Sequence, residues 1–339
     1  MKKNLTISIA AYNVENYLNK TLDSLVIDNM DKLEVLIVND GSKDNTKKIA
    51  EKYCKKYPKT FKLIDKKNDG YGSTINAGIK EATGKYFKQL DGDDWYNTEN
   101  LNKLVDDIEK INADVIYTPF ITYYEKDGKE EINSNSITNN SNENIEIEKI
   151  ISDSSILFMH NLAYNTKLLK ENKISIDEHC FYTDTEYVAL PFMCAKTIYI
   201  LDYPVYMYRV GREGQSVSVS GRKKHWQEHQ RVSYTLMDFY KKQAKKMNKN
   251  KKEYYEKYLA SIFASGIGNY LLTLEPNKEN FELIKKYDND IKMVSKKVYD
   301  LMPNYSKAVS TIRKNNYFLY KLLVNYKKIM WRIKWHIYI

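Results

Sequence analysis

The amino-acid sequence predicts an α/β fold, in which helices flank a mostly parallel sheet and a helical region follows at the C-terminal end. Over the first 120 of the 339 residues, short β-branched runs alternate with segments of helical spacing, the pattern of strands joined by crossover helices. From about His225 the spacing of apolar residues is helical to the end. Because 339 residues are many for one domain, we expect an α/β domain at residues 1–220 and a helical region at residues 221–339.

Four strands are expected in the first 120 residues, at 6–10, 33–38, 61–64 and 86–90. Helices are expected between them at 14–25, 46–57 and 73–81, with Asp44 or Asn45 capping the second and the Gly-Tyr-Gly of residues 70–72 preceding the third. Further along, residues 125–148 have no hydrophobic period and predict a surface hairpin and loop. Residues 197–200 and 205–208 have the pattern of strands. The alternation predicts a parallel sheet covered on both faces.

A polar cluster follows each of the first four strands, at residues 11–13, 39–42, 65–68 and 91–94. Because parallel strands end at one edge of the sheet, where ligands bind, we expect these clusters to converge. The last cluster places Asp91, Asp93 and Asp94 within four residues, where the carboxylates repel one another unless a cation or hydrogen bonds compensate. Carboxylate oxygens suit Mg²⁺ or Mn²⁺. Each cluster alone could be a surface turn; their joint position favours a ligand site.

In order and spacing, residues 5–95 resemble the family 2 glycosyltransferases, which have the nucleotide-sugar-binding GT-A fold. The shared motifs are Tyr12-Asn13, Asp40-Gly41-Ser42, an Asn-x-Gly within residues 68–78, and Asp91-Gly92-Asp93-Asp94. The resemblance implies that about residues 1–120 bind the sugar donor and about residues 121–220 receive the acceptor. One departure is Asn39, where the family often has Asp, but Asp40 is retained.

The resemblance also implies a role for each matching residue. Tyr12 would stack on uracil, and Asp40 would accept the imide N–H of that base. The nucleotide-binding residues would be Ala10, Tyr12, Asp40, Asn68, Gly72, Asp91 and Gly92. The ligands of Mn²⁺ or Mg²⁺ would come from Asp91, Asp93 and Asp94, and the sequence leaves open which of these carboxylates binds the ion directly.

A second segment resembles the part of inverting family members that carries the catalytic base, an acidic residue that deprotonates the acceptor hydroxyl. Here Asp184 occupies that place, with Thr183 where the family commonly has Glu. A positioned carboxylate makes a hydroxyl nucleophilic by taking its proton as the new bond forms. Asp184 is therefore the expected base and Glu186 the alternative. Without the resemblance, Asp184 could equally be a helix N-cap.

Four further residues are expected at the site from the same resemblance. Arg209 and Arg212 would neutralise the departing diphosphate, although they could equally be ion-paired surface residues. His160 and Trp95 would line the acceptor pocket. His225 and His229 have the i, i+4 spacing of a metal pair, but no third ligand is near in sequence, and we interpret them as a solvated helix face. The Gly-Tyr-Gly of residues 70–72 lacks the third glycine of a dinucleotide fingerprint.

The charge of the chain is concentrated at its C-terminal end. The net charge is +10, and residues 301–339 contain eight Lys or Arg and no acidic residue. As a helix, this tail would have an apolar face of Leu319, Leu322, Leu323, Tyr326, Met330, Ile333 and Ile337, basic residues Lys321, Lys328 and Arg332 opposite, and Trp331 and Trp335 beside it. This pattern suits an anionic membrane surface, and the alternative is a helix docked on the protein. Nucleic-acid binding is not favoured, because the remaining chain is nearly balanced in charge.

These patterns together predict a metal-dependent, inverting glycosyltransferase that uses a UDP-sugar, with a glycan or polyprenyl-linked acceptor, in cell-surface polysaccharide synthesis. Three cysteines without a paired spacing fit a reducing cytoplasm, and the tail predicts peripheral attachment to the inner face of the plasma membrane. One alternative is a nucleotidyltransferase, which would usually carry a Gly-rich basic loop after the first strand. Another is a non-catalytic nucleotide-sugar-binding protein. The sequence does not name the sugar.

Overall fold

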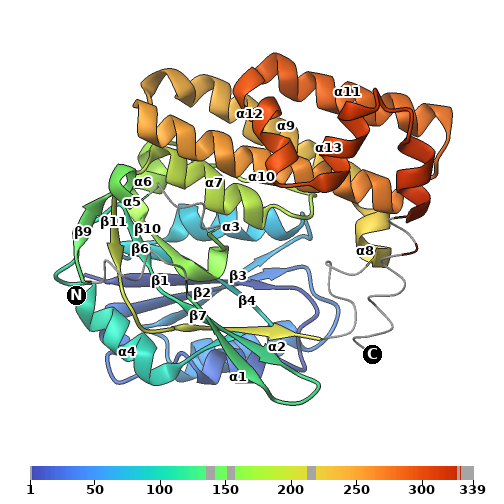
Figure 1. Cartoon of the computed structure of the whole chain (residues 1–339). Helices are drawn as coiled ribbons and strands as arrows, with labels where there is room; N and C mark the ends of the chain where they lie inside the picture. Colours follow the sequence, from blue (N-terminus) through green and yellow to red (C-terminus); the bar gives the residue numbers. More distant parts are fainter. Residues whose placement is uncertain (1, 135–141, 151–156, 212–218, 327–328, 330–339) are drawn as a thin grey trace. The chain divides into compact units, whose positions relative to one another are not determined.

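The computed structural model describes residues 2–134, 142–150, 157–211, 219–326 and 329. The chain divides into two compact units, Met1–Glu213 and Gly214–Ile339 (Figure 1). The first unit contains two sheets and the second is helical in its described residues.

An eight-stranded sheet forms the centre of the first unit. Its strands, in spatial order, are β3 (Phe61–Lys66), β2 (Leu33–Asp40), β1 (Leu5–Ala11), β4 (Tyr86–Asp91), β10 (Leu162–Asn165), β6 (Val115–Tyr117), β11 (Thr197–Ile200) and β9 (Asn144–Glu146). Strands β1 to β4 run parallel, while β10 is antiparallel to both of its neighbours. The strongly buried β1 and β2 are the hydrophobic centre. The predicted α/β fold with a mostly parallel sheet is confirmed.

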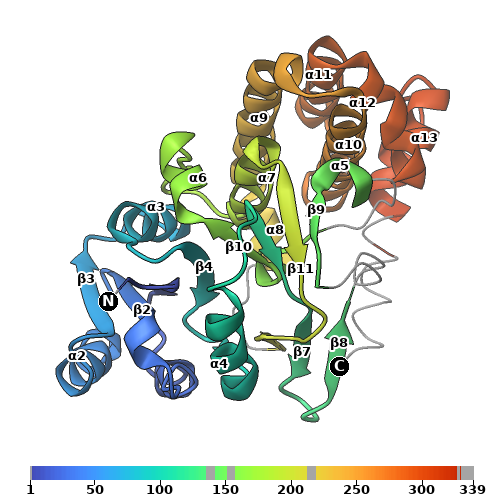
Figure 2. The ribbon, with the colours of Figure 1, turned by 90° about the vertical axis from the view of Figure 1, so that its left-hand side faces the viewer.

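Helices cover both faces of this sheet. In Figures 1 and 2, α1 (Leu18–Asp23), α2 (Thr46–Lys56) and α4 (Thr98–Asp107) lie on one face. On the other face lie α3 (Tyr71–Glu81), α6 (Thr166–Glu171) and α7 (Asp184–Cys194). A short helix, α5 (Ile147–Ile150), follows β9. Two predicted helix starts were wrong by a few residues.

The first of these helices begins at Leu18 and not at residue 14. The amide of Val14 donates to the hydroxyl of Thr46, and the amide of Glu15 donates to the carboxylate of Asp44. These bonds hold the segment after β1 against the loop after β2. An isolated turn bonds Leu18 to Val14, and the regular helix begins at Leu18. The third helix, in contrast, starts at Tyr71, two residues before the predicted start. Its N-cap is Gly70, whose φ of 87° only glycine adopts readily.

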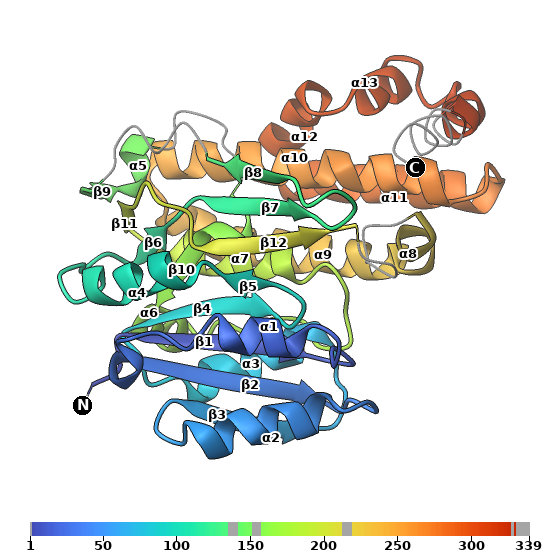
Figure 3. The ribbon, with the colours of Figure 1, turned by 90° about the horizontal axis from the view of Figure 1, so that it is seen from below.

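A second, four-stranded sheet packs beside the first. Its order is β5 (Trp95–Tyr96), β12 (Tyr206–Val210), β7 (Phe120–Tyr124) and β8 (Glu130–Asn133), and Figure 3 shows the four strands side by side. The antiparallel hairpin of β7 and β8 falls partly within the hairpin predicted for residues 125–148. Strand β12 pairs with β5, which directly follows residues 91–94. The small sheet is therefore anchored at the carboxyl end of β4.

The second unit consists of α8 (Val219–Lys224), α9 (Trp226–Gln243), α10 (Lys249–Thr273), α11 (Lys278–Val294), α12 (Lys296–Leu301) and α13 (Lys307–Lys314), as predicted for the C-terminal region. His225 and His229 are half-buried, and His225 Nδ1 lies 2.6 Å from a carboxylate oxygen of Glu228, so the predicted solvated face was wrong. In the parts of the chain that the structure describes, no helix combines the length and the apolar character needed to cross a membrane.

The start of the basic tail has two apolar faces. Residues 320–326 are helical. Tyr317, Tyr320 and Val324 are buried, so one face docks on the unit, while Phe318 and Leu322 are 89% and 65% exposed. The predicted tail residues Lys328, Met330, Trp331, Arg332, Ile333, Trp335 and Ile337 lie outside the described residues.

A buried ion pair fastens α13 to α11. The carboxylate of Asp288 is fully buried and receives two hydrogen bonds from the guanidinium of Arg313 and one from the hydroxyl of Tyr317. The guanidinium also donates to the carbonyl oxygen of Tyr299 at 2.6 Å and lies 3.4 Å above that ring. The charge of Asp288 is thus compensated almost entirely by one residue.

We predict that Arg313→Met destabilises the helical unit by about 3–5 kcal/mol, because it leaves a buried carboxylate without its cation. Thermal unfolding followed by circular dichroism at 222 nm measures the change. Replacing both partners, as in Asp288→Leu with Arg313→Met, should recover most of the loss. Lys314→Met, at an exposed neighbouring position, is the matched control. An Arg313→Met protein as stable as the parent would contradict the prediction.

Candidate functional site

The candidate site lies at the carboxyl edge of the parallel strands. Strand β1 lies between β2 and β4. The chain runs from β1 through β2 to β3 and then crosses back to β4 on the other side of β1, and ligands bind where the strand order reverses in this way. In the register of these strands, Ala10 pairs with Asp91 and Ala11 pairs with Asn39. Asp40 pairs with Lys66 on the next strand. The polar clusters predicted to converge therefore lie at one edge.

Tyr12 presents an accessible aromatic ring at this edge, with 47% of its surface exposed. The chain beside it is fixed by reciprocal bonds between the first two loops. The amide of Asn13 donates to the Ser42 hydroxyl at 3.1 Å, and the Asn13 side chain accepts from the Lys43 amide at 2.8 Å. A ring that is exposed and held on a fixed loop can stack on a planar ligand.

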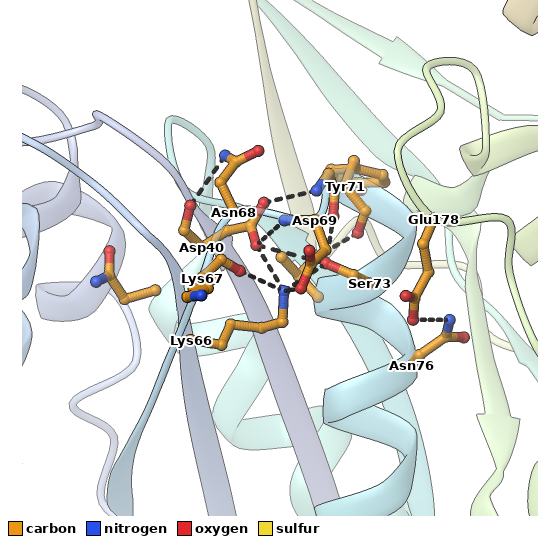
Figure 4. Close-up of polar contacts among 12 residues, drawn as sticks. Asp40, Lys66, Lys67, Asn68, Asp69, Tyr71, Ser73, Asn76 and Glu178 are labelled. Carbon is orange, nitrogen blue, oxygen red and sulfur yellow. Dashed lines mark hydrogen bonds and ion pairs between the residues drawn. The ribbon is translucent and has the colours of Figure 1, made fainter.

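The carboxylate of Asp40 organises the loop after β3 (Figure 4). Its Oδ1 accepts from Lys66 Nζ at 2.8 Å and from the Asp69 amide at 3.0 Å, and its Oδ2 accepts from the Gly70 amide at 3.0 Å. The Asn68 side chain donates to the Asp40 carbonyl oxygen at 2.9 Å. An ionised carboxylate offers about four acceptor sites, of which these bonds use three, and Asp40 is 2% exposed.

Three carboxylates crowd the turn after β4 in unequal surroundings. Asp91 and Asp93 are half-buried, whereas Asp94 is 2% exposed. The Tyr71 hydroxyl donates to Asp91 Oδ1 at 2.6 Å. Asp94 accepts from the Tyr206 hydroxyl at 2.7 Å and from the Arg209 amide at 2.8 Å. Burial, followed by the charges of Asp91 and Asp93, raises the pKa of Asp94 well above its usual range. A cation would relieve this repulsion.

Two of the predicted glycines mark close backbone approaches. The Gly92 amide donates to the Ala10 carbonyl oxygen at 3.0 Å, and a side-chain carbon on Gly92 would lie 2.8 Å from that oxygen. A side-chain carbon on Gly72 would lie only 2.1 Å from the carbonyl oxygen of Asp177. Gly92 thus allows the turn of residues 91–94, called the acidic turn below, to pack directly on β1. Gly72 allows the segment before α7 to lie directly on α3.

His160 lies beside the acidic turn, in the 3₁₀ turn Met159–Asn161 that precedes β10. It is 9% exposed, with its ring 4.3 Å from the ring of Tyr208 in a stacked arrangement and 4.6 Å from that of Tyr206. Burial, together with the charge of Lys88, lowers the pKa of His160 to about 3, so its imidazole is neutral. One ligand atom each of Asp91, Asp94 and His160 lie within 4.8 Å of one another.

The expected base, Asp184, is the first residue of α7 and is exposed. The protein around it nevertheless desolvates the carboxylate, which raises its pKa. Besides burial, the charges of Asp91 and Asp184 both contribute to the raised pKa values of Tyr71 and Tyr208. Asp184 therefore lies within electrostatic reach of the two tyrosines that adjoin the acidic turn.

Glu186 is placed differently. It is fully buried, and its Oε2 accepts from the Asp177 amide at 2.8 Å. On the other side of the same segment, the Asn76 side chain donates to the Ile176 carbonyl oxygen and accepts from the Ile176 amide, both at 2.8 Å. Asn76 also donates to Glu178 at 3.0 Å (Figure 4). Glu186 and Asn76 thus fix the chain that leads to Asp184, and the accessible acid is Asp184.

The predicted diphosphate and acceptor residues on the small sheet are packed inside the protein. Arg209 donates from Nε to the Asp93 carbonyl oxygen at 2.8 Å and pairs with Glu125 at 3.1 Å. Its guanidinium lies 4.9 Å from the ring of Trp95, which is itself 8% exposed. Arg209 therefore stabilises the backbone of the acidic turn. Arg212 lies outside the described residues.

Three residues of the site carried no sequence signal that singled them out. Tyr71 and Tyr206 bond the acidic turn, and they are two of 30 tyrosines. Lys88 is buried in β4, and burial lowers its pKa to about 7. Its ammonium donates to the carbonyl oxygens of His160 at 2.8 Å and Leu162 at 3.3 Å. For Lys88, its position within a predicted strand was the one feature of the sequence that could have indicated a buried lysine.

Comparison with known proteins agrees with this architecture. Residues 6–172 match the model of the family described as glycosyl transferase family 2. The chain is 26% identical over 211 residues to the uncharacterized glycosyltransferase EpsJ of Bacillus subtilis, covering 60% of each protein. It is 25% identical over 250 residues to the minor teichoic acid biosynthesis protein GgaB of the same organism, covering 71% of this chain and 27% of GgaB. The chain thus spans less than two thirds of these relatives.

A solved structure is similar over nearly the whole chain. S. aureus TarS 1–349, in complex with UDP-GlcNAc, superposes with a TM-score of 0.64 at 20% identity, covering 98% of this chain and 92% of TarS 1–349. At this identity the likeness concerns the fold. Together with the family match, it confirms the predicted GT-A fold and the resemblance read from the motifs.

Proposed function

Because the chain belongs to glycosyl transferase family 2 through residues 6–172, we propose that it is an inverting glycosyltransferase. It transfers a hexosyl or N-acetylhexosaminyl group from a UDP-sugar to a hydroxyl of a glycan or polyprenyl-linked acceptor in cell-surface polysaccharide synthesis. The observation that carries the proposal is the convergence of Tyr12, Asp40 and the acidic turn at one edge of the sheet. The charge of Asp184 acts on Tyr71 and Tyr208, which adjoin that turn. An exposed stacking surface, an acceptor for a base N–H, hard ligands and a base are the parts that this reaction needs.

The comparisons support the donor and acceptor classes without naming them for this chain. TarS 1–349 was solved with UDP-GlcNAc, which supports a nucleotide-sugar donor. GgaB is named for teichoic acid synthesis, which supports a cell-wall glycan as acceptor. In the proposed complex, uracil stacks on Tyr12 and its imide N–H donates to the carboxylate of Asp40.

The residues of the acidic turn fit a divalent cation. Asp91 and Asp94 offer hard oxygen ligands beside the neutral imidazole of His160. Burial and the neighbouring charges raise the pKa of Asp94, and a bound cation would offset this repulsion. Asp93 is on the same turn. When bound, Mn²⁺ or Mg²⁺ would neutralise charge on the leaving diphosphate.

In the proposed reaction, the exposed carboxylate of Asp184 takes the proton of the acceptor hydroxyl. The hydroxyl oxygen attacks the anomeric carbon on the face opposite the nucleotide, and the bond from that carbon to the diphosphate oxygen breaks, which inverts the configuration. UDP leaves with the bonding electron pair. Asp184 is held for this step by the segment that Asn76 and Glu186 fix.

We predict that Asp184→Asn lowers kcat for sugar transfer by about 10²–10⁴-fold, because an amide cannot accept the proton. The measurement is transfer or hydrolysis across a panel of UDP-sugars with Mn²⁺, together with UDP affinity by calorimetry, which should not change. Burial raises the pKa of Asp184 above its ordinary 3.8, and only the ionised form is a base. The acid limb of kcat/KM should therefore lie above pH 3.8, with activity rising as the pH rises.

The matched control for the base is Asp28→Asn, which neutralises an exposed carboxylate on the same unit and should leave kcat unchanged. Retention of transfer by Asp184→Asn, or equal loss in UDP binding and kcat, would contradict the role of Asp184. Absence of turnover with every UDP-sugar in the parent protein, despite UDP binding, would favour the non-catalytic alternative.

We predict that Tyr12→Ala weakens UDP binding roughly 5- to 150-fold, the equivalent of about 1–3 kcal/mol for one stacked base. Tyr12→Phe keeps the ring and should bind UDP as the parent does, which separates stacking from the hydroxyl. Calorimetric titration with UDP measures both. An equal loss in the two variants would exclude stacking as the cause.

We further propose that the C-terminal tail places the enzyme on the anionic inner face of the plasma membrane. Phe318, Leu322, Tyr326 and Ile329 are 89%, 65%, 59% and 56% exposed, at spacings of four, four and three residues that share one helix face. The tail from residue 301 carries eight basic residues and no acid. Exposed apolar side chains amid positive charge fit an anionic lipid surface.

We predict that the protein sediments with phosphatidylglycerol vesicles and not with phosphatidylcholine vesicles, and that added salt weakens the binding. Replacing Phe318 and Leu322 together by Ser should weaken it by about tenfold or more, because their burial in lipid is lost. Met293→Ser removes an apolar side chain that is 86% exposed on α11 and serves as the control. Equal binding to both kinds of vesicle would refute an electrostatic surface role.

A further inference from the structure

His160 lies beside the carboxylates of Asp91 and Asp94. The expected metal ligands therefore include a histidine nitrogen as well as carboxylate oxygens. One ligand atom each of Asp91, Asp94 and His160 lie within 4.8 Å of one another. Ligands bound at about 2.1 Å from one ion can be at most about 4.2 Å apart. Three ligands of one ion lie closer together than this limit, and the three atoms are near enough to share a cation after a modest approach.

The imidazole has a reason to be bound there. His160 is 9% exposed, and its Nδ1 is buried without a hydrogen-bond partner among the residues that the structure describes. Buried polar atoms nearly always have a partner, so this nitrogen is open to a bound water or ion. A ligand nitrogen of the same ring lies close to carboxylate oxygens of Asp91 and Asp94, and a cation is a ligand that suits all three groups.

The ring is also held in place for such a role. It is stacked at 4.3 Å on Tyr208, and the rings of Tyr206 and Phe120 lie 4.6 and 5.0 Å away. The ammonium of Lys88 fixes the backbone by donating to the His160 carbonyl oxygen at 2.8 Å. Side chains that orient a metal ligand in this way are typical of metal sites.

We propose that His160 supplies a nitrogen ligand to the divalent cation of this site, together with the carboxylates of Asp91 and Asp94. The inference deepens the proposed function, on whose metal dependence it rests. Imidazole binds first-row transition ions more readily than Mg²⁺, which prefers oxygen ligands. The presence of His160 therefore makes the site select Mn²⁺ over Mg²⁺.

The test is pulsed electron paramagnetic resonance of Mn²⁺ bound to the full chain in the presence of UDP. The chain has five histidines, so ¹⁵N-histidine labelling restricts the label to few atoms, and UDP carries none of it. We expect a ¹⁵N coupling typical of a directly bound imidazole. The coupling should disappear in His160→Phe, which keeps an aromatic ring among Tyr206, Tyr208 and Phe120 but has no nitrogen.

The same variant should bind Mn²⁺ about tenfold or more weakly, with a smaller change for Mg²⁺, as measured by calorimetry. His225→Gln removes a half-buried histidine from the helical unit and should change neither the coupling nor the affinity. Circular dichroism checks that His160→Phe is folded. If it is not, His160→Asn and the labelled parent protein provide the same comparison.

The possible failures are distinguishable. A bound Mn²⁺ without ¹⁵N coupling in the parent, or with coupling that persists in His160→Phe, overturns the role of His160 and leaves the metal-dependent reaction intact. No bound Mn²⁺ in the presence of UDP overturns both the ligand assignment and the proposed metal dependence. Sugar transfer measured in parallel shows whether the remaining part of the proposed function holds.

Discussion

The first unit is arranged around the buried carboxylate of Asp94. A carboxylate withdrawn from water is tolerated only where hydrogen bonds replace its hydration. Its donors are the Tyr206 hydroxyl and the Arg209 amide, which are 112 and 115 residues further along the chain. These bonds hold β12, and through it the small sheet, against the carboxyl end of β4. The same strand supplies Tyr208, on which His160 stacks. The hydrogen bonds to the buried carboxylate of Asp94 thus fix β12 and Tyr208 beside the acidic turn.

The donor side of the site and the expected base are joined through α3. Gly72 and Asn76, on that helix, touch the backbone of residues 176 and 177 from one side, and Glu186 binds the same backbone from the other. The start of α3 is in turn fixed by Asp40, which accepts from the amides of Asp69 and Gly70. Hydrogen bonds at the start and in the middle of α3 therefore connect the expected base-recognition residue, through that helix, to the segment before Asp184. The residues proposed to bind the donor and the segment that carries the proposed base are therefore both held by α3.

The spacing of apolar residues predicted the strands and helices, because these depend mainly on residues close together in the sequence. The runs of β1 and β2 are rich in β-branched apolar residues, and parallel topology alone implied that Asp40 and the acidic turn would meet. Hydrogen bonds between residues far apart in the chain leave no comparable pattern in the sequence. Tyr71 and Tyr206 reach carboxylates 20 and 112 residues away, in a chain where tyrosine is common. The family resemblance led us to expect Arg209 at the diphosphate, and the structure shows that its guanidinium bonds the backbone of the acidic turn and pairs with Glu125. The same resemblance led us to expect His160 at the acceptor, and the sequence could not show that its ring also lies close to Asp91 and Asp94.

The bonds that Asp94 makes to β12 also limit how the chain can be divided. The family match ends at residue 172, yet both donors to Asp94 lie beyond it, as does Asp184. A fragment that stopped at this boundary would contain the acidic turn but would enclose a carboxylate with neither donor present. The smallest excisable piece of this protein therefore extends through Val210, the last residue of β12. Exchange of the first 172 residues between relatives would have to include β12 as well.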